Sequence, residues 1–199
     1  MVIFLHGLGS NGQDLIGLAP HMIKSIPETV FISPDAPFPC DMVPAGYPNS
    51  HQWFSLQNRD PDVILRGLQD VQPTLSAFID EQRKLYDMPA DRCALVGFSQ
   101  GTMTALYTAL RYPDLAGVLG FSGAFFAGDK AQIINKPAIH LIHGESDDVV
   151  PVEAHAAAME SLNALDMNVT GYTQPRLTHS IDEKGLASGS AFLADVFKK

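Results

Sequence analysis

The chain has 199 residues, of which 46% are hydrophobic and 18% are charged, and its formal net charge is −9. These values are typical of one folded domain with a substantial core, so we expect residues 1–199 to form a single domain. The negative charge and the lack of a Lys/Arg cluster argue against nucleic-acid binding and against docking on an anionic membrane. No apolar run approaches the roughly eighteen residues of a transmembrane helix.

The first apolar run, at residues 2–5, is too short for the core of a signal peptide and has no basic residues before it. Cys40 and Cys93 have neither a metal-binding nor a redox spacing. No His-Glu-x-x-His, P-loop or calcium-loop pattern is present. We therefore expect a reduced, cytoplasmic protein without a metal.

Short apolar runs alternate with helical patterns along the whole chain. We expect strands at residues 2–5, 29–33, 93–96, 116–122, 138–143 and 168–173, and helices at residues 14–23, 60–86, 100–112, 152–165 and 181–197. This alternation, without hairpins or repeats, is typical of an α/β protein whose parallel sheet has helices on both faces. Functional residues are then expected at the carboxyl ends of the strands. Residues 34–60 form a long loop that we place over the active site, since connections of this length are usually functional.

The most informative motif is Gly97-Phe98-Ser99-Gln100-Gly101, which lies between a predicted buried strand and a predicted helix. This context is typical of a nucleophile elbow, the sharp turn that presents a reactive serine. We expect a strained backbone at Ser99, with glycines on both sides because a Cβ would clash there. The hydroxyl would lie at a helix N-terminus, where unpaired N–H groups favour negative charge.

A serine hydroxyl is a good nucleophile only when a base takes its proton. In sheets of this kind an acid and then a histidine follow the serine along the chain. Of the four histidines after Ser99, only His179 lies in a loop past the final predicted strand. Asp147 and Asp148 follow the preceding strand, and both qualify as the acid that orients the imidazole.

Acyl transfer also requires two hydrogen-bond donors for the oxyanion of the tetrahedral intermediate. We expect one to be the backbone N–H of Gln100, directly after the nucleophile. The other is expected to be the N–H of Leu8, in the loop His6-Gly7-Leu8-Gly9 after the first strand. The glycines would let this backbone approach the substrate.

The same loop supports an alternative function. Gly7, Gly9 and Gly12 match the Gly-x-Gly-x-x-Gly fingerprint of a dinucleotide-binding oxidoreductase, and Asp35 has the spacing of a ribose-binding acid. Against this hypothesis, the helix that should begin at Gly12 is predicted to start near Asp14, and the serine motif stays unexplained. A non-catalytic module on a hydrolase fold is a further alternative, which the three triad residue types disfavour.

Together, these residues resemble the carboxylesterase, phospholipase and acyl-protein thioesterase family of α/β-hydrolases. The matching segments follow the family's order along nearly the whole chain: His6-Gly7-Leu8-Gly9-Ser10, Pro34-Asp35-Ala36-Pro37, Trp53-Phe54, Gly97-Phe98-Ser99-Gln100-Gly101, Phe121-Ser122-Gly123, His143-Gly144 with Asp147 and Val150-Pro151, and His179-Ser180-Ile181. The resemblance implies an α/β-hydrolase fold and the hydrolysis of carboxylic esters or thioesters without any cofactor, often in a homodimer. It implies Ser99 as nucleophile, Asp147 rather than Asp148 as acid, and His179 as base, and it implies the oxyanion donors Leu8 and Gln100.

Three residues depart from the family's pattern: Ser55 where aspartate is frequent, Thr102 where a second glycine is common, and Thr178 where glycine usually precedes the histidine. None removes a catalytic group, but each can reshape the pocket. The chain also begins directly on the strand before the His-Gly loop, whereas the family usually has two strands before it. Without those strands, residues 29–33 would form an apolar sheet edge. We therefore expect a chain that is shorter than its natural form or that pairs this edge in an oligomer.

The expected mechanism is a two-step acyl transfer through an acyl-enzyme on Ser99. The acyl pocket is predicted to be lined by Phe38, Met42, Trp53, Phe54, Phe125, Phe126, Val149 and Val150. Alternatively, several of these aromatic residues anchor the long loop to the core. The acidic surface disfavours polyanionic substrates, so small to medium neutral acyl esters are preferred over thioesters and lysophospholipids.

Overall fold

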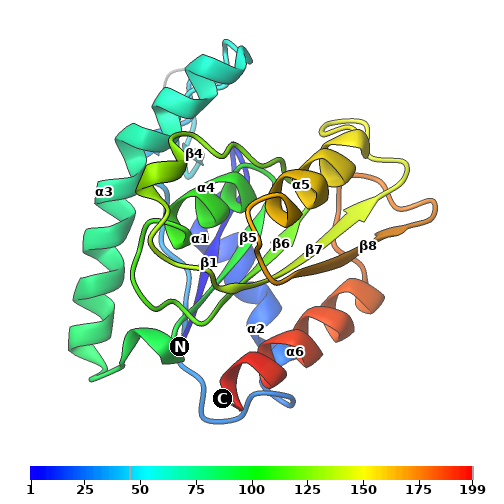
Figure 1. Cartoon of the computed structure of the whole chain (residues 1–199). Helices are drawn as coiled ribbons and strands as arrows, with labels where there is room; N and C mark the ends of the chain where they lie inside the picture. Colours follow the sequence, from blue (N-terminus) through cyan, green and yellow to red (C-terminus); the bar gives the residue numbers. More distant parts are fainter. Residues whose placement is uncertain (45, 199) are drawn as a thin grey trace.

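The computed structural model describes residues 1–44 and 46–198, and its centre is a six-stranded sheet (Figure 1). The strands are β1 (Val2–Leu5), β2 (Phe31–Ile32), β5 (Ala94–Phe98), β6 (Gly117–Phe121), β7 (Ala138–Gly144) and β8 (Val169–Gln174). They lie in the order β2-β1-β5-β6-β7-β8, and every neighbouring pair is parallel. The parallel sheet predicted from the sequence is confirmed.

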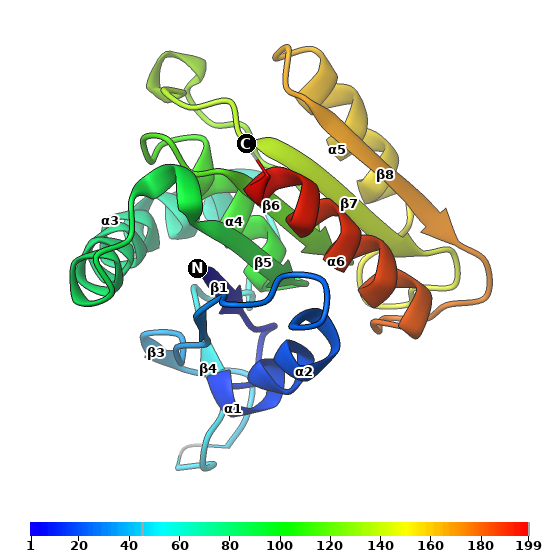
Figure 2. The ribbon, with the colours of Figure 1, turned by 90° about the horizontal axis from the view of Figure 1, so that it is seen from below.

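Helices cover both faces of this sheet. One face carries α3 (Pro61–Leu85), α4 (Gln100–Ala109) and α5 (Glu153–Asn163), and the other carries α1 (Gly12–Leu15), α2 (Ala19–Met22) and α6 (Glu183–Phe197). Figure 2 shows α1, α2 and α6 on the near side of the sheet. Within the described residues, short 3₁₀ helices lie at Ile16–Leu18, Ala90–Arg92 and Lys130–Gln132.

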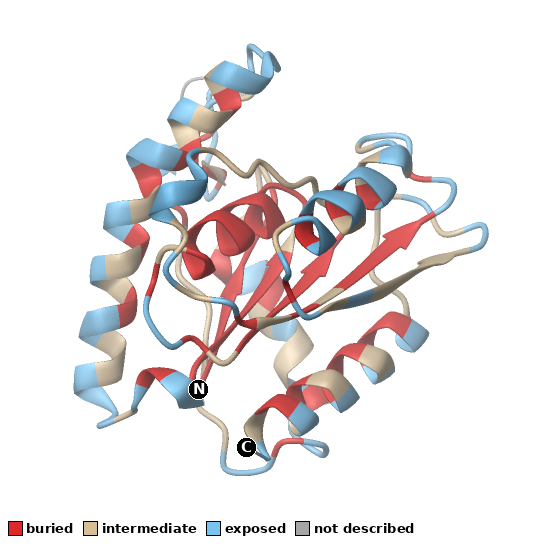
Figure 3. Cartoon of the chain, viewed as in Figure 1, coloured by how far each residue is buried: buried red, intermediate tan, exposed pale blue. Residues whose placement is uncertain are grey.

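Each strand contributes to two hydrophobic cores, one on each face of the sheet. In β1, Ile3 and Leu5 pack in the core beneath α3, α4 and α5, whereas Val2 and Phe4 pack in the core formed with α1, α2 and α6. All four side chains are fully buried, and Figure 3 shows the central strands and α4 as the most buried part of the molecule. Successive side chains of a strand point to opposite faces, so a strand covered on both sides is a continuous apolar run.

The first helical segment and the second strand differ from their predicted bounds. The helix expected at residues 14–23 is divided into α1, a 3₁₀ turn and α2, and α1 begins at Gly12 because the Asn11 side chain accepts the N–H of Asp14. β2 covers only Phe31–Ile32 and forms one edge of the sheet. An edge of two residues offers little backbone for pairing with another chain.

The long region between residues 34 and 60 contains a hairpin that the sequence did not predict. Its strands, β3 (Phe38–Pro39) and β4 (His51–Gln52), pair antiparallel outside the main sheet. The hairpin is joined to the loop after β1, because Gly9 N–H donates to His51 O at 2.8 Å and His51 N–H donates to Ser10 O at 2.9 Å. Strands of two residues are too short to show an alternating pattern in the sequence.

The start of α4 is packed so closely against β1 that only glycine fits at residue 101. A Cβ on Gly101 would lie 1.8 Å from the carbonyl oxygen of Leu5. We expect Gly101→Ala to lower the free energy of unfolding by at least about 2 kcal/mol, because the backbone must shift to relieve the clash. Urea unfolding measures this change.

The control is Gly17→Ala, because a Cβ on Gly17 would have no neighbour within 4 Å. That variant is expected to change the free energy of unfolding by less than about 1 kcal/mol. Equal stability of the two variants would contradict the packing argument.

Candidate active site

Ser99 occupies a sharp turn between β5 and α4. Its φ is 55° and its ψ is −117°, a conformation that costs about 1–3 kcal/mol in a non-glycine residue. The turn is held by close packing, since a Cβ on Gly97 would lie 2.5 Å from the backbone nitrogen of Thr102. Ser99 N–H also donates to Phe121 O of the neighbouring strand at 2.9 Å. The surrounding backbone therefore fixes Ser99 at the N-terminus of α4.

Asp147 lies in the loop after β7 and contacts His179, which lies in the loop after β8. His179 Nδ1 is 2.8 Å from Asp147 Oδ2, and Asp147 Oδ1 accepts the N–H groups of Val149 and Val150. Burial raises the pKa of Asp147, but the hydrogen bonds from His179, Val150 and Val149 outweigh it, so the pKa lies below its usual value. The ionised carboxylate can orient the imidazole and stabilise its cation. Asp148, the other acid considered, is exposed.

Two further histidines lie behind Asp147. The Nε2 atom of His143 is 2.9 Å from Val150 O and 3.3 Å from Asp147 Oδ2. The ring of His155 packs edge-on against that of His143, with 6.1 Å between centroids. Burial, followed by the proximity of His143 and His140, lowers the pKa of His155 to about 4. The His155 ring is therefore uncharged at neutral pH.

Ser99 and His179 line one cavity of about 410 Å³ at the carboxyl ends of the strands. The ring of Phe98 lies against that of His179, with 4.8 Å between centroids. Among the described residues no hydrogen bond joins Ser99 Oγ to His179; such bonds are often long before substrate binds. A Cβ on Gly7 would lie 3.4 Å from Ser99 Cβ, so the loop after β1 lies next to the serine.

The cavity includes only part of the predicted substrate-binding set. Phe126, Val149 and Val150 line it, as does Leu8. The lining residues that the sequence did not predict to bind substrate are Gly7, Ser10, Leu15, Leu56, Arg59, Ile64, Phe98, Met103, Ala124, Pro151 and Ala154. A signal was available for Met103, which lies one helical turn after Ser99 and so on the same side of α4. No comparable local pattern marks Leu56 or Arg59.

Five predicted substrate-binding residues do not line this cavity. Phe38 and Met42 lie on or near the hairpin and are 46% and 52% exposed. Trp53 and Phe54 are buried in the core beneath α3, α4 and α5, and Phe125 packs against that core. Phe54 faces α3 so closely that a Cβ on Gly67 would lie 2.7 Å from its Cβ. For Trp53 and Phe54, the alternative role as anchors of the long loop fits the structure.

The three departures from the family pattern lie outside the cavity lining. Ser55 and Thr178 are exposed. Thr102 is buried, and its hydroxyl donates to Phe121 O at 2.8 Å and accepts Phe121 N–H at 3.0 Å. A Cβ on Gly120 would lie 2.6 Å from the Thr102 methyl group, so glycine there makes room for threonine.

The glycine-rich loop does not have the contacts of a dinucleotide site. α1 begins at Gly12, contrary to the prediction, but it has only four residues. The Gly12 N–H donates to Asp35 Oδ1 at 2.8 Å, so the acid assigned to a ribose hydroxyl is bound to the helix start. A Cβ on Gly12 would lie 2.0 Å from Ser33 O, which explains the third glycine by packing.

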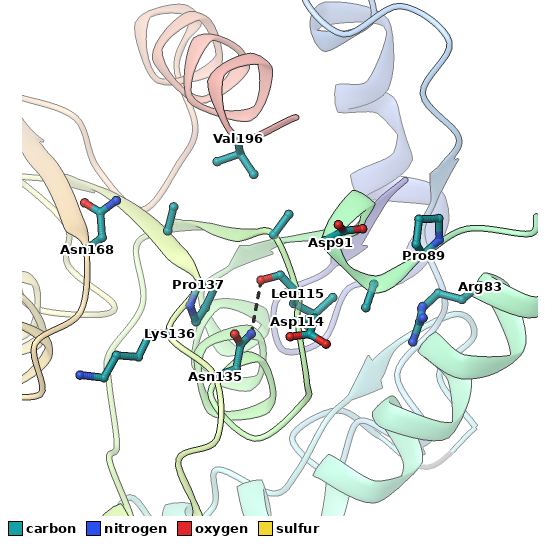
Figure 4. Close-up of a pocket in the computed structure, with 13 residues that line it drawn as sticks. Arg83, Pro89, Asp91, Asp114, Leu115, Asn135, Lys136, Pro137, Asn168 and Val196 are labelled. Carbon is teal, nitrogen blue, oxygen red and sulfur yellow. Dashed lines mark hydrogen bonds between the residues drawn. The ribbon is translucent and has the colours of Figure 1, made fainter. Parts of the chain in front are cut away.

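A second, more open cavity of about 670 Å³ lies at the opposite edge of the sheet, where the strands begin (Figure 4). Its charged side chains, which include Asp91, Asp114 and Lys136, come from separate segments. The hydrogen bond drawn there is structural, since Asn135 Nδ2 donates to Leu115 O. The smaller cavity combines a strained serine with a histidine–carboxylate pair, so we take it as the candidate active site.

Residues 1–197 match the phospholipase/carboxylesterase family. The chain belongs to this family. Acyl-protein thioesterase 1 from Debaryomyces hansenii is 30% identical to it over all of this chain and 91% of the relative. Esterase YpfH from Escherichia coli is 28% identical over 94% of this chain and 78% of the relative. Of the solved structures, that of esterase PE8 has a TM-score of 0.89 and 38% identity over 98% of this chain and 91% of that chain.

These matches confirm the α/β-hydrolase fold and the family resemblance noted in the sequence. As a member of the phospholipase/carboxylesterase family, the chain is a hydrolase with an esterase or thioesterase function. Within residues 1–44 and 46–198, no helix has the length and apolar character needed to cross a bilayer.

We expect His155 to make the stability of the protein sensitive to acid, because its pKa in the folded chain is lowered to about 4. Well above pH 6.5 the ring is neutral in both the folded and the unfolded chain and adds no pH dependence. Between pH 6.5 and about 4 the unfolded chain binds a proton that the folded chain does not, so stability falls as the pH falls. By pH 4.5 we expect this group alone to lower the free energy of unfolding by about 2 kcal/mol.

Urea unfolding of the wild type and of His155→Gln at pH 7.0 and pH 4.5 tests this expectation. The wild type should lose about 2 kcal/mol more than the variant over this interval. Equal losses would show that His155 titrates normally in the folded protein.

Proposed function

We propose that the enzyme hydrolyses small to medium neutral acyl esters through a triad of Ser99, His179 and Asp147. The observation that carries this proposal is the 2.8 Å contact between His179 Nδ1 and Asp147 Oδ2, in a cavity that also contains the strained Ser99. With Nδ1 donating to the carboxylate, Nε2 of His179 is left without a proton and can act as a base.

In the first step, Ser99 Oγ attacks the carbonyl carbon while His179 Nε2 takes the hydroxyl proton. The tetrahedral intermediate then collapses, and the leaving alcohol takes that proton from His179, which leaves an ester on Ser99. In the second step, water gives a proton to His179 and attacks this ester. The acid is released and the proton returns to Ser99.

The oxyanion of each intermediate is proposed to bind the backbone N–H groups of Gln100 and Leu8. Gln100 is the first residue of α4, so its N–H is among those that a helix leaves unpaired. Leu8 lines the cavity, and its N–H has no acceptor in the part of the chain that the structure describes. Donors of this kind typically contribute 10²–10³-fold each to the rate.

The cavity supports an acyl substrate of limited length. Most of its lining is apolar, and its volume of about 410 Å³ restricts the group that can lie beside Ser99. As expected substrates, thioesters and lysophospholipids rank behind neutral esters. The homodimer and the cytoplasmic location expected from the sequence also remain predictions.

A fluorophosphonate probe tests the proposed nucleophile. We expect one covalent adduct per chain, mapped to Ser99 by peptide mass spectrometry. The adduct should be absent in Ser99→Ala and should form at least about 10²-fold more slowly in His179→Ala, because the serine then lacks its base. An adduct that persists in Ser99→Ala would refute the assignment. The control Ser55→Ala removes an exposed serine outside the cavity and should label normally.

A bulky side chain at residue 154 tests the acyl cavity. Ala154 lines the cavity at the start of α5, whereas Ala157 lies on the exposed side of the same helix. We expect Ala154→Phe to reduce kcat/KM for octanoyl esters at least about 10-fold relative to acetyl esters, since the phenyl ring fills acyl space. Ala157→Phe should leave this ratio unchanged. A ratio that is the same in both variants would place the acyl chain elsewhere.

A further inference from the structure

His6 fixes the peptide that carries one of the proposed oxyanion donors. Its Nε2 accepts Ala36 N–H at 2.9 Å, so the ring proton is on Nδ1, which donates to Gly7 O at 2.7 Å. The C=O and N–H of a trans peptide point in opposite directions. Holding the carbonyl of Gly7 therefore aims the N–H of Leu8 away from His6. Burial lowers the pKa of His6, so the ring stays neutral and keeps this hydrogen bond.

The side chain of Gln100 is bound to the long loop and does not reach into the cavity. Its Oε1 accepts Trp53 N–H at 2.9 Å, and its Nε2 donates to Phe54 O at 2.7 Å. Gln100 is fully buried and is not a cavity-lining residue. Both hydrogen-bonding groups of the side chain are therefore used to hold the residue whose backbone N–H is the other proposed donor.

Trp53 connects the loop after β1 to the side chain of Gln100. Its indole Nε1 donates to His6 O at 2.9 Å, and its ring lies 5.6 Å from the His6 ring between centroids. Because Trp53 also contacts Gln100 through its backbone, one buried residue connects both proposed donors.

The loop after β1 has further anchors to the same region. Gly9 N–H donates to His51 O at 2.8 Å, and Ser50 Oγ donates to Gly9 O at 2.9 Å. Gly9 has a φ of 80°, a conformation that glycine adopts without strain. We call Ala36 together with residues 50–54 the clamp segment, because its hydrogen bonds go to the loop after β1 and to Gln100.

We propose that the clamp segment positions both oxyanion donors, with His6, Trp53 and the Gln100 side chain as positioning residues. The inference rests on the proposed function, since it assigns a role to donors that the acyl-transfer mechanism requires. Oxyanion stabilisation depends on donors that are already in place, and small displacements remove much of it. The long loop thus acts on the chemistry through Gln100 and His6, apart from the cavity residues that it contributes.

The test uses Gln100→Met, which keeps the length of the side chain but removes both hydrogen bonds to the clamp segment, and Trp53→Phe, which removes the indole N–H and keeps an aromatic ring. We expect each to lower kcat about 10- to 100-fold while KM changes less than about 3-fold, because the oxyanion exists only after the attack. The inhibition constant of a trifluoromethyl ketone, which forms a tetrahedral adduct with an active serine, should rise by the same factor as kcat falls. A merely structural role would not move these two quantities together.

A second pair of variants examines His6. His6→Asn keeps an N–H donor near Gly7 O, whereas His6→Ala keeps none, so the asparagine variant should recover part of the kcat that the alanine variant loses. The matched control is Ser190→Ala, which removes a buried hydrogen bond to Leu186 O in α6. Its kcat and its affinity for the ketone should equal those of the wild type.

Two results would overturn the inference: unchanged kcat and ketone affinity in folded Trp53→Phe and Gln100→Met, or losses confined to KM. If Gln100→Met does not fold, Trp53→Phe alone decides, because it deletes a single hydrogen bond. Ser99→Ala separates the two proposals. Full activity in that variant would refute the proposed function, whereas an inactive Ser99→Ala beside fully active clamp variants would refute only the role of the clamp segment.

Discussion

The site depends on one constraint, the close approach of the backbone at the end of β1 to the backbone at the start of α4. A Cβ on Gly101 would lie 1.8 Å from Leu5 O, and a Cβ on Gly7 would lie 3.4 Å from Ser99 Cβ. β1 and β5 are neighbouring parallel strands, so their carboxyl ends meet at one edge of the sheet. Two segments that are more than ninety residues apart in the chain are thereby brought around the same serine.

The other half of the sheet places the proposed acid and the proposed base. β7 and β8 are also parallel neighbours, and the loops that follow them carry Asp147 and His179. A Cβ on Gly144 would lie 2.2 Å from Leu177 O, so these two loops pack against one another without a side chain between them. The buried carboxylate is stabilised by three hydrogen bonds, which keep it ionised where an isolated charge would be costly.

The long loop has two roles that its composition does not separate. Leu56 and Arg59 line the cavity, whereas Trp53 and Phe54 are buried and hydrogen-bonded to Gln100. The first pair can therefore contact a bound substrate, whereas the second pair holds the loop against the start of α4. In the hairpin that precedes these residues, Phe38 is exposed and does not line the cavity.

The parallel sheet, the sharp turn at Ser99 and the family all follow from the sequence alone, which also singles out His179 as the proposed base. These follow from apolar runs, from glycine spacing and from chain order, which are local or sequential properties. In the folded chain Asp147 and not Asp148 faces His179, a distinction that the residues alone left open and the resemblance implied. The fold also makes Trp53 an anchor, because its side chain takes its direction from a distant partner, the carbonyl oxygen of His6, which no local pattern encodes.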